Sequence, residues 1–132
     1  MASIFTKIIK GEIPCYKIAE DDRFFAFLDI NPLKAGHTLV VPKIETDYIF
    51  DLDNDTLAGI FIFAKKVAVA IKSVVNSKRI GVVVAGLEVP HAHIHLIPMD
   101  SMGDISFSKP KVKLGPDEFK DLARKISEKV RV

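Results

Sequence analysis

The chain carries four histidines, and three of them lie within five residues, in the segment VPHAHIHLIP at positions 89–98. His91, His93 and His95 alternate with apolar residues. Side chains along a β-strand point alternately to its two faces, so on a strand the three imidazoles share one face and the apolar residues share the other. Same-face neighbours lie roughly 7 Å apart, and a phosphate-sized group can therefore contact more than one imidazole.

This spacing is compatible with three roles. The histidines are structural residues with local hydrogen bonds, or they are ligands of a metal such as zinc, with Asp29 or Glu88 completing the site. In the third role, one histidine is a nucleophile that attacks phosphorus while its neighbours handle protons and charge. His37, near the start of another predicted strand, makes the purely structural role the least favoured. Spacing alone leaves the other two open.

The composition of the whole chain bounds the setting of this cluster. With 132 residues, 48% of them hydrophobic, we expect a single domain over residues 1–132 with a sizeable core. Nineteen basic and 17 acidic residues give a net charge of +2, and the absence of a basic block argues against a nucleic-acid partner. Cys15 is the only cysteine, which excludes an internal disulfide. Without a signal-peptide pattern or a run of about 18 apolar residues, we expect a cytoplasmic protein with no membrane partner.

Turn signals and periodicity predict the elements that must position the histidines. Residues 3–11 predict a short helix with Ser3 as its N-cap. The segments CYKIAED and RFFAFLD predict a hairpin of two strands, and HTLVVP predicts a third strand after a loop. RIGVVVAG and HAHIHLIPM predict the fourth and fifth strands. After a polar loop, a last helix is predicted to begin at Pro116.

The clearest helix is predicted at about residues 55–75, where apolar residues follow helical spacing. Its predicted core face consists of Leu57, Ile60, Phe61, Ala64, Val67, Ala68, Ile71 and Val75. The opposite face carries Ile62, Phe63 and Val69, and a helix that is apolar nearly all round is usually covered on two sides. The second cover is expected to be another subunit. The order of elements predicts an α+β fold, one antiparallel sheet with helices packed against it.

The motif HAHIHLI, together with FLDINP and GHTLVVPK, resembles the histidine triad (HIT) family, and most closely its branch of purine nucleoside phosphoramidases. The resemblance covers nearly the whole chain, since IFTKIIKGEIP and AEDDRFFAFLDINPLKAGHTLVVPK match the first half of the family almost element for element. It implies a HIT-like five-stranded antiparallel sheet with one long and two shorter helices. It also implies a purine nucleotide as substrate, and a homodimer that pairs through the long helix and a neighbouring strand.

The same resemblance implies roles for individual residues. His93 matches the nucleophile, which attacks the α-phosphorus and forms a covalent nucleotidyl-histidine that water then hydrolyses. His91 and His95 match flanking histidines that position it and contact the phosphate or leaving group, and His37 matches a fourth histidine that supports them. Asp29 matches the residue that binds the ribose hydroxyls. The apolar residues around the base are matched by Ile4, Phe5, Ile8, Phe27 and Leu28, with Ile30 beside Asp29 and Glu88 as a candidate near the phosphate. From residue types alone, core packing of the apolar residues and turn chemistry at Asp29 remain alternatives.

Two features depart from the family pattern. Val84 stands where many members carry an asparagine and Leu87 where many carry a glutamine, so polar contacts near the phosphate or leaving group are missing. The loss of one donor from a preorganised site costs on the order of 10²–10³ in rate. Ser3 and Thr6 stand at the positions of a Cys-x-x-Cys that belongs to a structural zinc site in some bacterial members, and both are poor zinc ligands. We therefore expect no bound metal and no cofactor.

Two functions from different classes follow. The first is a hydrolase that cleaves nucleoside 5′-phosphoramidates or related nucleotidyl substrates at the α-phosphorus. The second is a nucleotide-binding or scaffold protein of the same fold with weak or no turnover, which Val84 and Leu87 favour. A metal enzyme of another fold is a distant third.

Overall fold

The computed structural model describes residues 2–131, and the two ends of the predicted domain, residues 1 and 132, lie outside them. The elements are, in chain order, α1 (Ile4–Ile9), β1 (Lys17–Glu20), β2 (Phe24–Leu28), β3 (Thr38–Pro42), the 3₁₀ helix η1 (Ile49–Asp51), α2 (Asn54–Val74), β4 (Arg79–Val83), β5 (Ile94–Met99), the 3₁₀ helix η2 (Met102–Ile105) and α3 (Pro116–Lys129). The predicted order of helices and strands is confirmed. The short helix η2 lies in the segment for which the sequence predicts only a loop.

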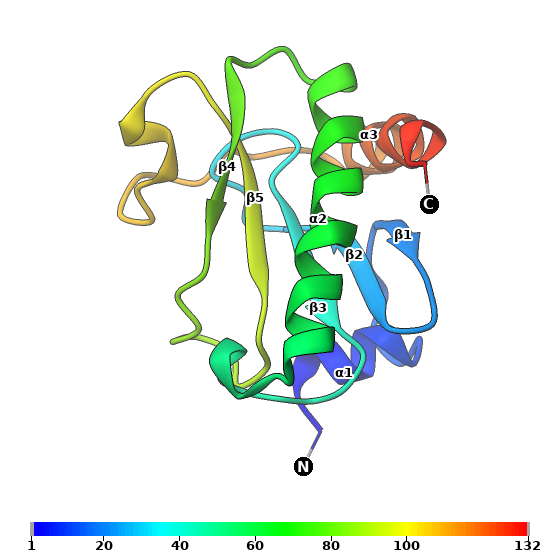
Figure 1. Cartoon of the computed structure of the whole chain (residues 1–132). Coiled ribbons are helices and arrows are strands. Elements are labelled where there is room, and N and C mark those ends of the chain that lie inside the picture. Colours follow the sequence, from blue (N-terminus) through cyan, green and yellow to red (C-terminus); the bar gives the residue numbers. More distant parts are fainter. Residues whose placement is uncertain (1, 132) are drawn as a thin grey trace.

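The five strands form one antiparallel sheet in the order β1-β2-β3-β5-β4 (Figure 1). The predicted α+β fold with a five-stranded sheet is therefore confirmed. Strand β5, which carries the end of the histidine segment, is flanked on both sides by β3 and β4. In the register, Leu39 lies opposite both Phe27 and His95, and His95 lies opposite Val83. His95 is thus held in the interior of the sheet.

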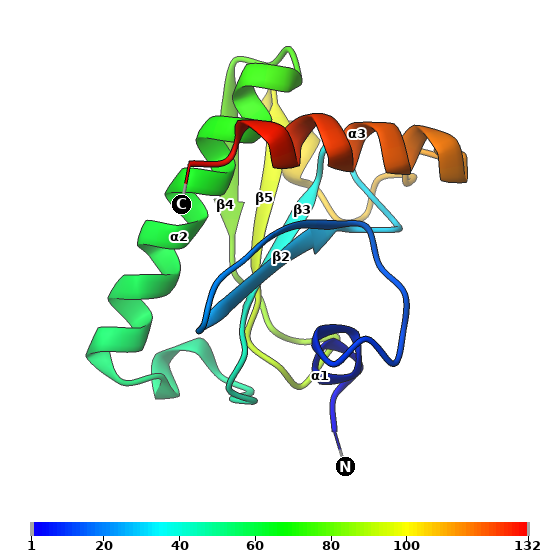
Figure 2. The same cartoon turned by 90° about the vertical axis from the view of Figure 1, so that its right-hand side faces the viewer.

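Helices cover both faces of β2 and β3, so every residue of these two strands is buried. On one face, α2 and α3 pack in the larger core, against Phe24, Ala26, Leu28, Val40, Ile94 and Leu96. On the other face, Phe5 and Ile8 of α1 pack against Phe25, Phe27, Leu39 and Val41. Figure 2 shows α2 and α3 meeting at one side of the molecule, with α1 apart from both. Because directly paired residues point to the same face of a sheet, His95 shares the α1 face with Leu39.

The ends of the short helices follow from their capping residues. Ser3 Oγ accepts a hydrogen bond from the backbone N–H of Thr6 at 3.0 Å, which confirms Ser3 as the N-cap of α1. Helix α3 begins at Pro116, as predicted, and the Glu118 carboxylate accepts the N–H of Gly115 at 3.1 Å. None of the helices within residues 2–131 combines the length and the apolar character needed to cross a membrane.

The prediction for α2 is right about its extent and partly wrong about its faces. Phe63, predicted on the outer face, is only 3% exposed, whereas Phe61, predicted in the core, is 43% exposed. The buried stripe consists of Ile60, Phe63, Ala64, Val67, Ala70 and Ile71. Ile62 and Val69 are exposed, as expected. Since α2 is apolar on several sides, the sequence does not distinguish positions 61 and 63, and contact with the sheet decides which one is buried.

Gly36 should be irreplaceable at the turn before β3. Its φ is +98°, and a Cβ there would lie 2.9 Å from Val75 Cγ2 and 3.2 Å from Pro98 Cγ. Gly11 is a matched control, because its φ is +80° and a Cβ there would have no atom within 4 Å. Gly11→Ala should cost about 1–2 kcal/mol for the left-handed backbone, and Gly36→Ala about 1–3 kcal/mol more for the overlap. Urea unfolding measures both, and equal losses would contradict the steric argument.

Candidate active site

The histidine segment enters the sheet later than predicted. Strand β5 begins at Ile94, so His91 and His93 precede it and only His95 lies within it. The prediction of one continuous strand over the three histidines is wrong, because the chain turns at residues 89–91, where His91 N–H donates to Val89 C=O at 2.8 Å. The imidazoles still gather on the α1 face. All three are buried, and the rings of His93 and His95 contact each other edge to face with centroids 5.0 Å apart.

His93 has a defined tautomer. Its Nδ1 lies 2.7 Å from the backbone carbonyl oxygen of His91. A carbonyl only accepts hydrogen bonds, so Nδ1 carries the proton, and in the neutral ring Nε2 bears the lone pair. The only buried side-chain polar atom without a partner among the described residues is Ser77 Oγ. Nε2 of His93, which makes no hydrogen bond among these residues, is therefore open to solvent. This is the geometry that a nucleophilic imidazole requires.

His37 and His95 form a second chain of hydrogen bonds. The backbone N–H of Leu33 donates to His37 Nδ1 at 3.0 Å, which places the proton of the neutral His37 ring on Nε2. His37 Nε2 then donates to His95 Nδ1 at 2.9 Å. The neutral His95 ring must therefore carry its own proton on Nε2, the nitrogen left free to donate to a ligand. A backbone amide thus sets the tautomers of two histidines in succession.

Burial keeps these two rings neutral. Desolvation is the main cause that lowers the pKa of His37 to about 3, and the neighbouring His95 and Lys111 add to it. Desolvation also lowers the pKa of His95 to about 4, with a smaller contribution from His93. Both rings therefore act as hydrogen-bonding groups rather than as cations near pH 7.

Asp29 combines the two roles that the sequence leaves open. Its Oδ1 accepts the backbone N–H of Asn31 at 2.8 Å, the turn interaction expected before Asn-Pro. Its Oδ2 lies 3.6 Å from His37 Nε2, whose proton is already given to His95. Burial raises the pKa of Asp29, while the Asn31 hydrogen bond opposes that rise. Oδ2 thus remains an acceptor for a ligand.

Asp29, His37 and His95 are also the group that can hold a metal ion among residues 2–131. One atom from each lies within 4.8 Å of the others. His37 Nε2 and His95 Nδ1 are joined by a hydrogen bond of 2.9 Å, so an ion bound to these two nitrogens would have to displace the proton between them.

A cavity of about 250 Å³, termed here the α1 cavity, lies between α1, β2 and residues 88–89. The residues that the resemblance assigns to the base and the ribose line it together with Glu88, His93 and His95: Ile4, Phe5, Ile8, Phe27, Leu28, Asp29 and Ile30. The sequence does not single out its other lining residues, Ile13, Pro14, Cys15, Asn31, Leu39 and Val89. These lie in a loop or on the buried face of β3, and no local pattern distinguishes them from core residues.

A second cavity, termed the Phe107 cavity, meets the first at His93 and His95. It measures about 220 Å³ and is lined by Ala85, Gly86, Leu87, Glu88, His93, His95 and Phe107. The Phe107 ring contacts His95 edge to face with centroids 4.8 Å apart. Since His93, His95 and Glu88 line both cavities, a molecule extending from one to the other passes the free nitrogen of His93. The sequence gives no signal for Phe107, because the segment after β5 has no periodic pattern.

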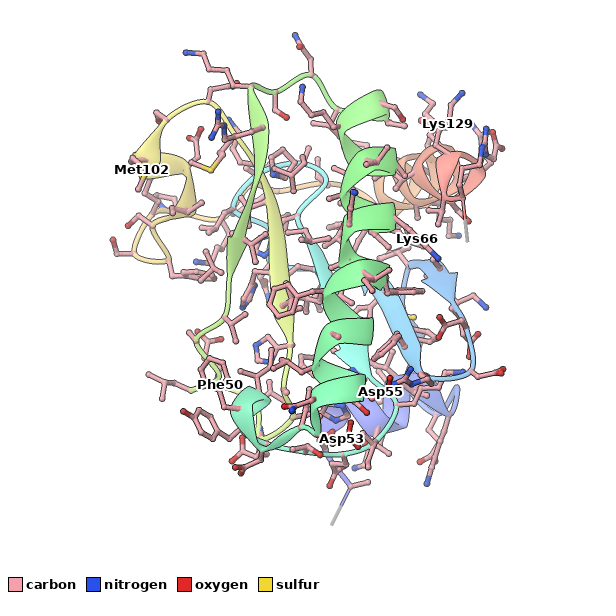
Figure 3. The ribbon with its side chains drawn as sticks, viewed as in Figure 1. Phe50, Asp53, Asp55, Lys66, Met102 and Lys129 are labelled. Atoms are coloured by element: carbon pink, nitrogen blue, oxygen red, sulfur yellow. The ribbon has the colours of Figure 1, made fainter. Side chains whose placement is uncertain are left out.

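A third cavity, termed the α2 cavity, contains Val84. It measures about 340 Å³, and its lining includes Tyr48, Phe50, Phe61, Val84 and Leu87, together with His93. The side chain that replaces the family asparagine thus belongs to an apolar wall. Figure 3 shows Phe50 on the η1 segment, at the same end of the molecule as the start of α2.

His91 lies outside all three cavities. It is fully buried, and its Nε2 donates to the Pro42 carbonyl at 2.8 Å. Its Nδ1 accepts the hydroxyl of Ser3 at 2.7 Å. Contact between His91 and a phosphate, one of the two roles that the resemblance implies, does not fit this position, whereas a role in holding His93 does.

Comparison with known proteins identifies the family of this chain. The family model of the HIT domain matches residues 10–102. The chain belongs to the histidine triad family. An adenosine 5′-monophosphoramidase of Schizosaccharomyces pombe is 37% identical to this HIT chain over 137 residues, 99% of the chain and 100% of the relative. An adenylylsulfatase of Arabidopsis thaliana is 35% identical over 100 residues, 72% of the chain and 51% of the relative.

The similarity to solved structures covers more of the chain than residues 10–102, which the family model matches. The crystal structure of a hypothetical histidine triad nucleotide-binding protein from Sulfolobus tokodaii has a TM-score of 0.84 and 31% identity, and the match covers 95% of this HIT chain and 89% of that one. The family fold that the resemblance implies is therefore confirmed over nearly the whole chain.

The neutral histidine pair should make the protein lose stability on mild acidification. An unfolded histidine takes up a proton near pH 6.5, whereas the native rings resist protonation down to about 3 for His37 and about 4 for His95. The unfolded state therefore binds more protons below pH 6.5, and stability falls as the pH is lowered. We expect the two rings to contribute a loss of roughly 2 kcal/mol per pH unit between pH 6 and pH 5, above the range where most carboxylates titrate.

Urea unfolding at pH 7, 6 and 5 measures this slope, and His37→Gln is the matched variant because it removes one of the two titrating rings. The variant should show a shallower decline than the wild type. Parallel profiles for the two proteins would mean that His37 is not responsible.

Proposed function

We propose that this HIT protein hydrolyses nucleoside 5′-phosphoramidates through a covalent nucleotidyl intermediate on His93. The hydrogen bond from His93 Nδ1 to the His91 carbonyl carries the proposal, because it leaves the Nε2 lone pair open where the α1 and Phe107 cavities meet. The adenosine 5′-monophosphoramidase of S. pombe, 37% identical over the length of this chain, supports the same chemistry.

In the proposed complex, the nucleotide occupies the α1 cavity. The purine packs among the apolar side chains of α1 and β2, such as Phe5, Ile8 and Phe27. Asp29 Oδ2, the oxygen not used by Asn31, accepts the ribose hydroxyls. This arrangement places the α-phosphorus beside His93.

The reaction then proceeds in two displacements. The lone pair on His93 Nε2 forms a bond to phosphorus while the phosphorus–nitrogen bond of the substrate breaks, and the departing amine takes its electron pair and a proton from water. A water oxygen next attacks phosphorus, the bond to His93 breaks, its electron pair returns to Nε2, and the water proton passes to solvent. His95 Nε2–H donates a hydrogen bond to the phosphoryl oxygens in both steps, since its Nδ1 is occupied by His37.

The Phe107 cavity takes the leaving group and favours an amine. Among residues 2–131, its lining combines Ala85, Leu87 and Phe107 with one carboxylate, Glu88, and it includes no lysine or arginine. A sulfate leaving group, as the name of the Arabidopsis adenylylsulfatase indicates for that relative, would be repelled by the Glu88 carboxylate of the lining. The Lys111 ammonium, 5.6 Å from the centroid of the Phe107 ring, offsets this repulsion only in part. An apolar amine has contacts with Phe107, and a cationic one is also attracted by Glu88.

A nucleotide-binding role without efficient turnover is the second candidate. Val84 supports it, because this side chain cannot donate a hydrogen bond to a phosphate oxygen and lies in an apolar wall beside His93. Turnover by the wild-type protein decides between the two candidates.

Two substitutions separate chemistry from binding. His93→Ala should lower the kcat for adenosine 5′-phosphoramidate by at least about 10³-fold and change AMP affinity by less than roughly tenfold, because the base and ribose contacts lie elsewhere.

Asp29→Ala should weaken AMP binding by about 1–3 kcal/mol and reduce the preference for ribose over deoxyribose. Calorimetry and AMP release measure these effects, and rapid quenching should trap a phosphorus–nitrogen adduct on the wild type only. Adenylyl sulfate, tested in parallel, should be the poorer substrate. Near-normal turnover by His93→Ala would refute the assignment.

We also propose a homodimer. Strand β4 is an edge of the sheet, and exposed apolar side chains lie on α2, at η1, in β4 and in the loop after β4: Tyr48, Phe50, Phe61, Ile62, Val69, Val82, Val84 and Leu87. Apolar surface of this extent is unusual on a monomer. A second copy pairing along β4 and α2 would cover it and extend the sheet.

Light scattering at micromolar concentration should give twice the mass of one chain. Ile62→Glu places a charge on the exposed face of α2 and should shift the protein towards the monomer. A monomeric wild type would remove the dimer proposal.

A further inference from the structure

We propose that Ser3, Thr6 and Glu45 position the nucleophile by forming a hydrogen-bonded clamp on His91, which in turn holds His93. These three residues are termed the N-terminal clamp. The inference rests on the proposed function, because the clamp serves the reaction of His93. It assigns a role to a cluster that touches neither the substrate cavities nor the reacting atoms.

Every hydrogen of the N-terminal clamp has one consistent direction. The Glu45 carboxylate accepts the backbone N–H of Ser3 at 2.7 Å and the hydroxyl of Thr6 at 2.6 Å. Ser3 Oγ accepts the backbone N–H of Thr6 at 3.0 Å. Its own hydroxyl has two acceptors in reach, His91 Nδ1 at 2.7 Å and Thr6 Oγ1 at 3.3 Å, and the shorter contact assigns the proton to His91. Thr6 Oγ1 is 3.4 Å from the same nitrogen but gives its proton to Glu45. The hydrogen bonds therefore run from the exposed Glu45 carboxylate inward, and the Ser3 hydroxyl ends on the buried His91 ring.

These hydrogen bonds are held by an anionic Glu45. The hydrogen bonds from Ser3 and Thr6 lower the pKa of Glu45 to about 2, the Ser3 N–H being the largest cause. The carboxylate therefore stays an acceptor across the working pH range. Its neighbour Thr46 adds a further tie, since the Thr46 carbonyl accepts the N–H of Ala92 at 2.7 Å.

His91 passes this constraint to His93 through its own backbone. Its ring is fixed at both nitrogens, by Ser3 and by the Pro42 carbonyl, so the ring cannot flip without losing a buried hydrogen bond. The carbonyl of the same residue accepts His93 Nδ1–H. Movement of His91 would shift the acceptor that fixes the His93 tautomer, and with it the direction of the Nε2 lone pair.

Packing against α1 connects the same residues a second time. The Phe5 ring contacts both His91 and His93 edge to face, with centroids 5.8 Å and 5.1 Å apart. Since Phe5 also lines the α1 cavity, the helix that the clamp anchors is the one that meets the proposed nucleobase. A helix N-cap by itself needs only the acceptor on Ser3 Oγ, so the donation to His91 is a separate interaction.

Ser3→Ala, with Asp53→Ala as its control, tests the positioning role. Asp53 is the N-cap of α2, accepts the N–H of Thr56 at 2.7 Å, and is labelled at the start of that helix in Figure 3. Both substitutions remove an N-cap acceptor, but only Ser3 touches a histidine. Two readouts are needed: kcat and KM with adenosine 5′-phosphoramidate, and the imidazole ¹⁵N spectrum of His93, which reports the tautomer without any turnover.

Ser3→Ala should lower kcat roughly 10- to 100-fold, because a small misplacement of a reacting group has effects of this size, and should change KM by less than about threefold. The ¹⁵N spectrum should change from a single Nδ1-protonated form of His93 to a mixture of tautomers. Ser3→Thr keeps the hydroxyl and should restore both readouts. Asp53→Ala should lower the urea midpoint comparably and leave kcat and the His93 spectrum unchanged.

An unchanged His93 spectrum in Ser3→Ala would overturn the proposal, and so would equal losses of kcat in Ser3→Ala and Asp53→Ala. If the wild type does not turn over phosphoramidates, the proposed function fails by itself, and the spectrum of His93 still decides whether the N-terminal clamp fixes its tautomer.

Discussion

The hydrogen bond between His93 Nδ1 and the His91 carbonyl is the constraint on which the rest of the site depends. A neutral imidazole has one proton for two nitrogens, so binding that proton to the backbone determines which nitrogen is free to react. The acceptor must then stay in place. His91 is fixed through both of its ring nitrogens, and the segment before β5 is tied to residues 42 and 46 by hydrogen bonds. The chemistry of a side chain is thus set by backbone geometry two residues away.

The sheet explains how four histidines can be buried together. One face is occupied by the larger apolar core under α2 and α3, and the α1 face carries a smaller apolar cluster beside the histidines. The α1 face can therefore carry polar groups, provided that each finds a partner. His37 meets this condition by accepting from Leu33 and donating to His95. Burial then depresses the pKa of both rings, so the pair supplies directed N–H groups without adding charge beside an anionic substrate.

The sequence predicts those features that depend on local patterns or on the family motif. The order of strands and helices, the Ser3 cap and the Pro116 start follow from turn signals and periodicity, and the structure contains all of them. The face of α2 is missed because adjacent apolar residues at positions 61–63 give no preference, and only the packed sheet selects Phe63. Glu45 and Phe107 are missed for a different reason. Glu45 accepts hydrogen bonds from Ser3 and Thr6, which lie 42 and 39 positions earlier in the chain. Phe107 contacts His95 from a loop that has no periodic sequence pattern.

The departure at Val84 also follows from its surroundings. Val84 lies in the α2 cavity with Phe50, Phe61 and Leu87, so its side chain extends a largely apolar lining. Val84 continues the exposed apolar surface of α2 and β4 up to His93. Val84 therefore offers no hydrogen-bond donor in the cavity that it shares with His93. His95 Nε2–H is a donor on the α1 face, and the Leu33–His37 hydrogen bonds hold it in a single tautomer.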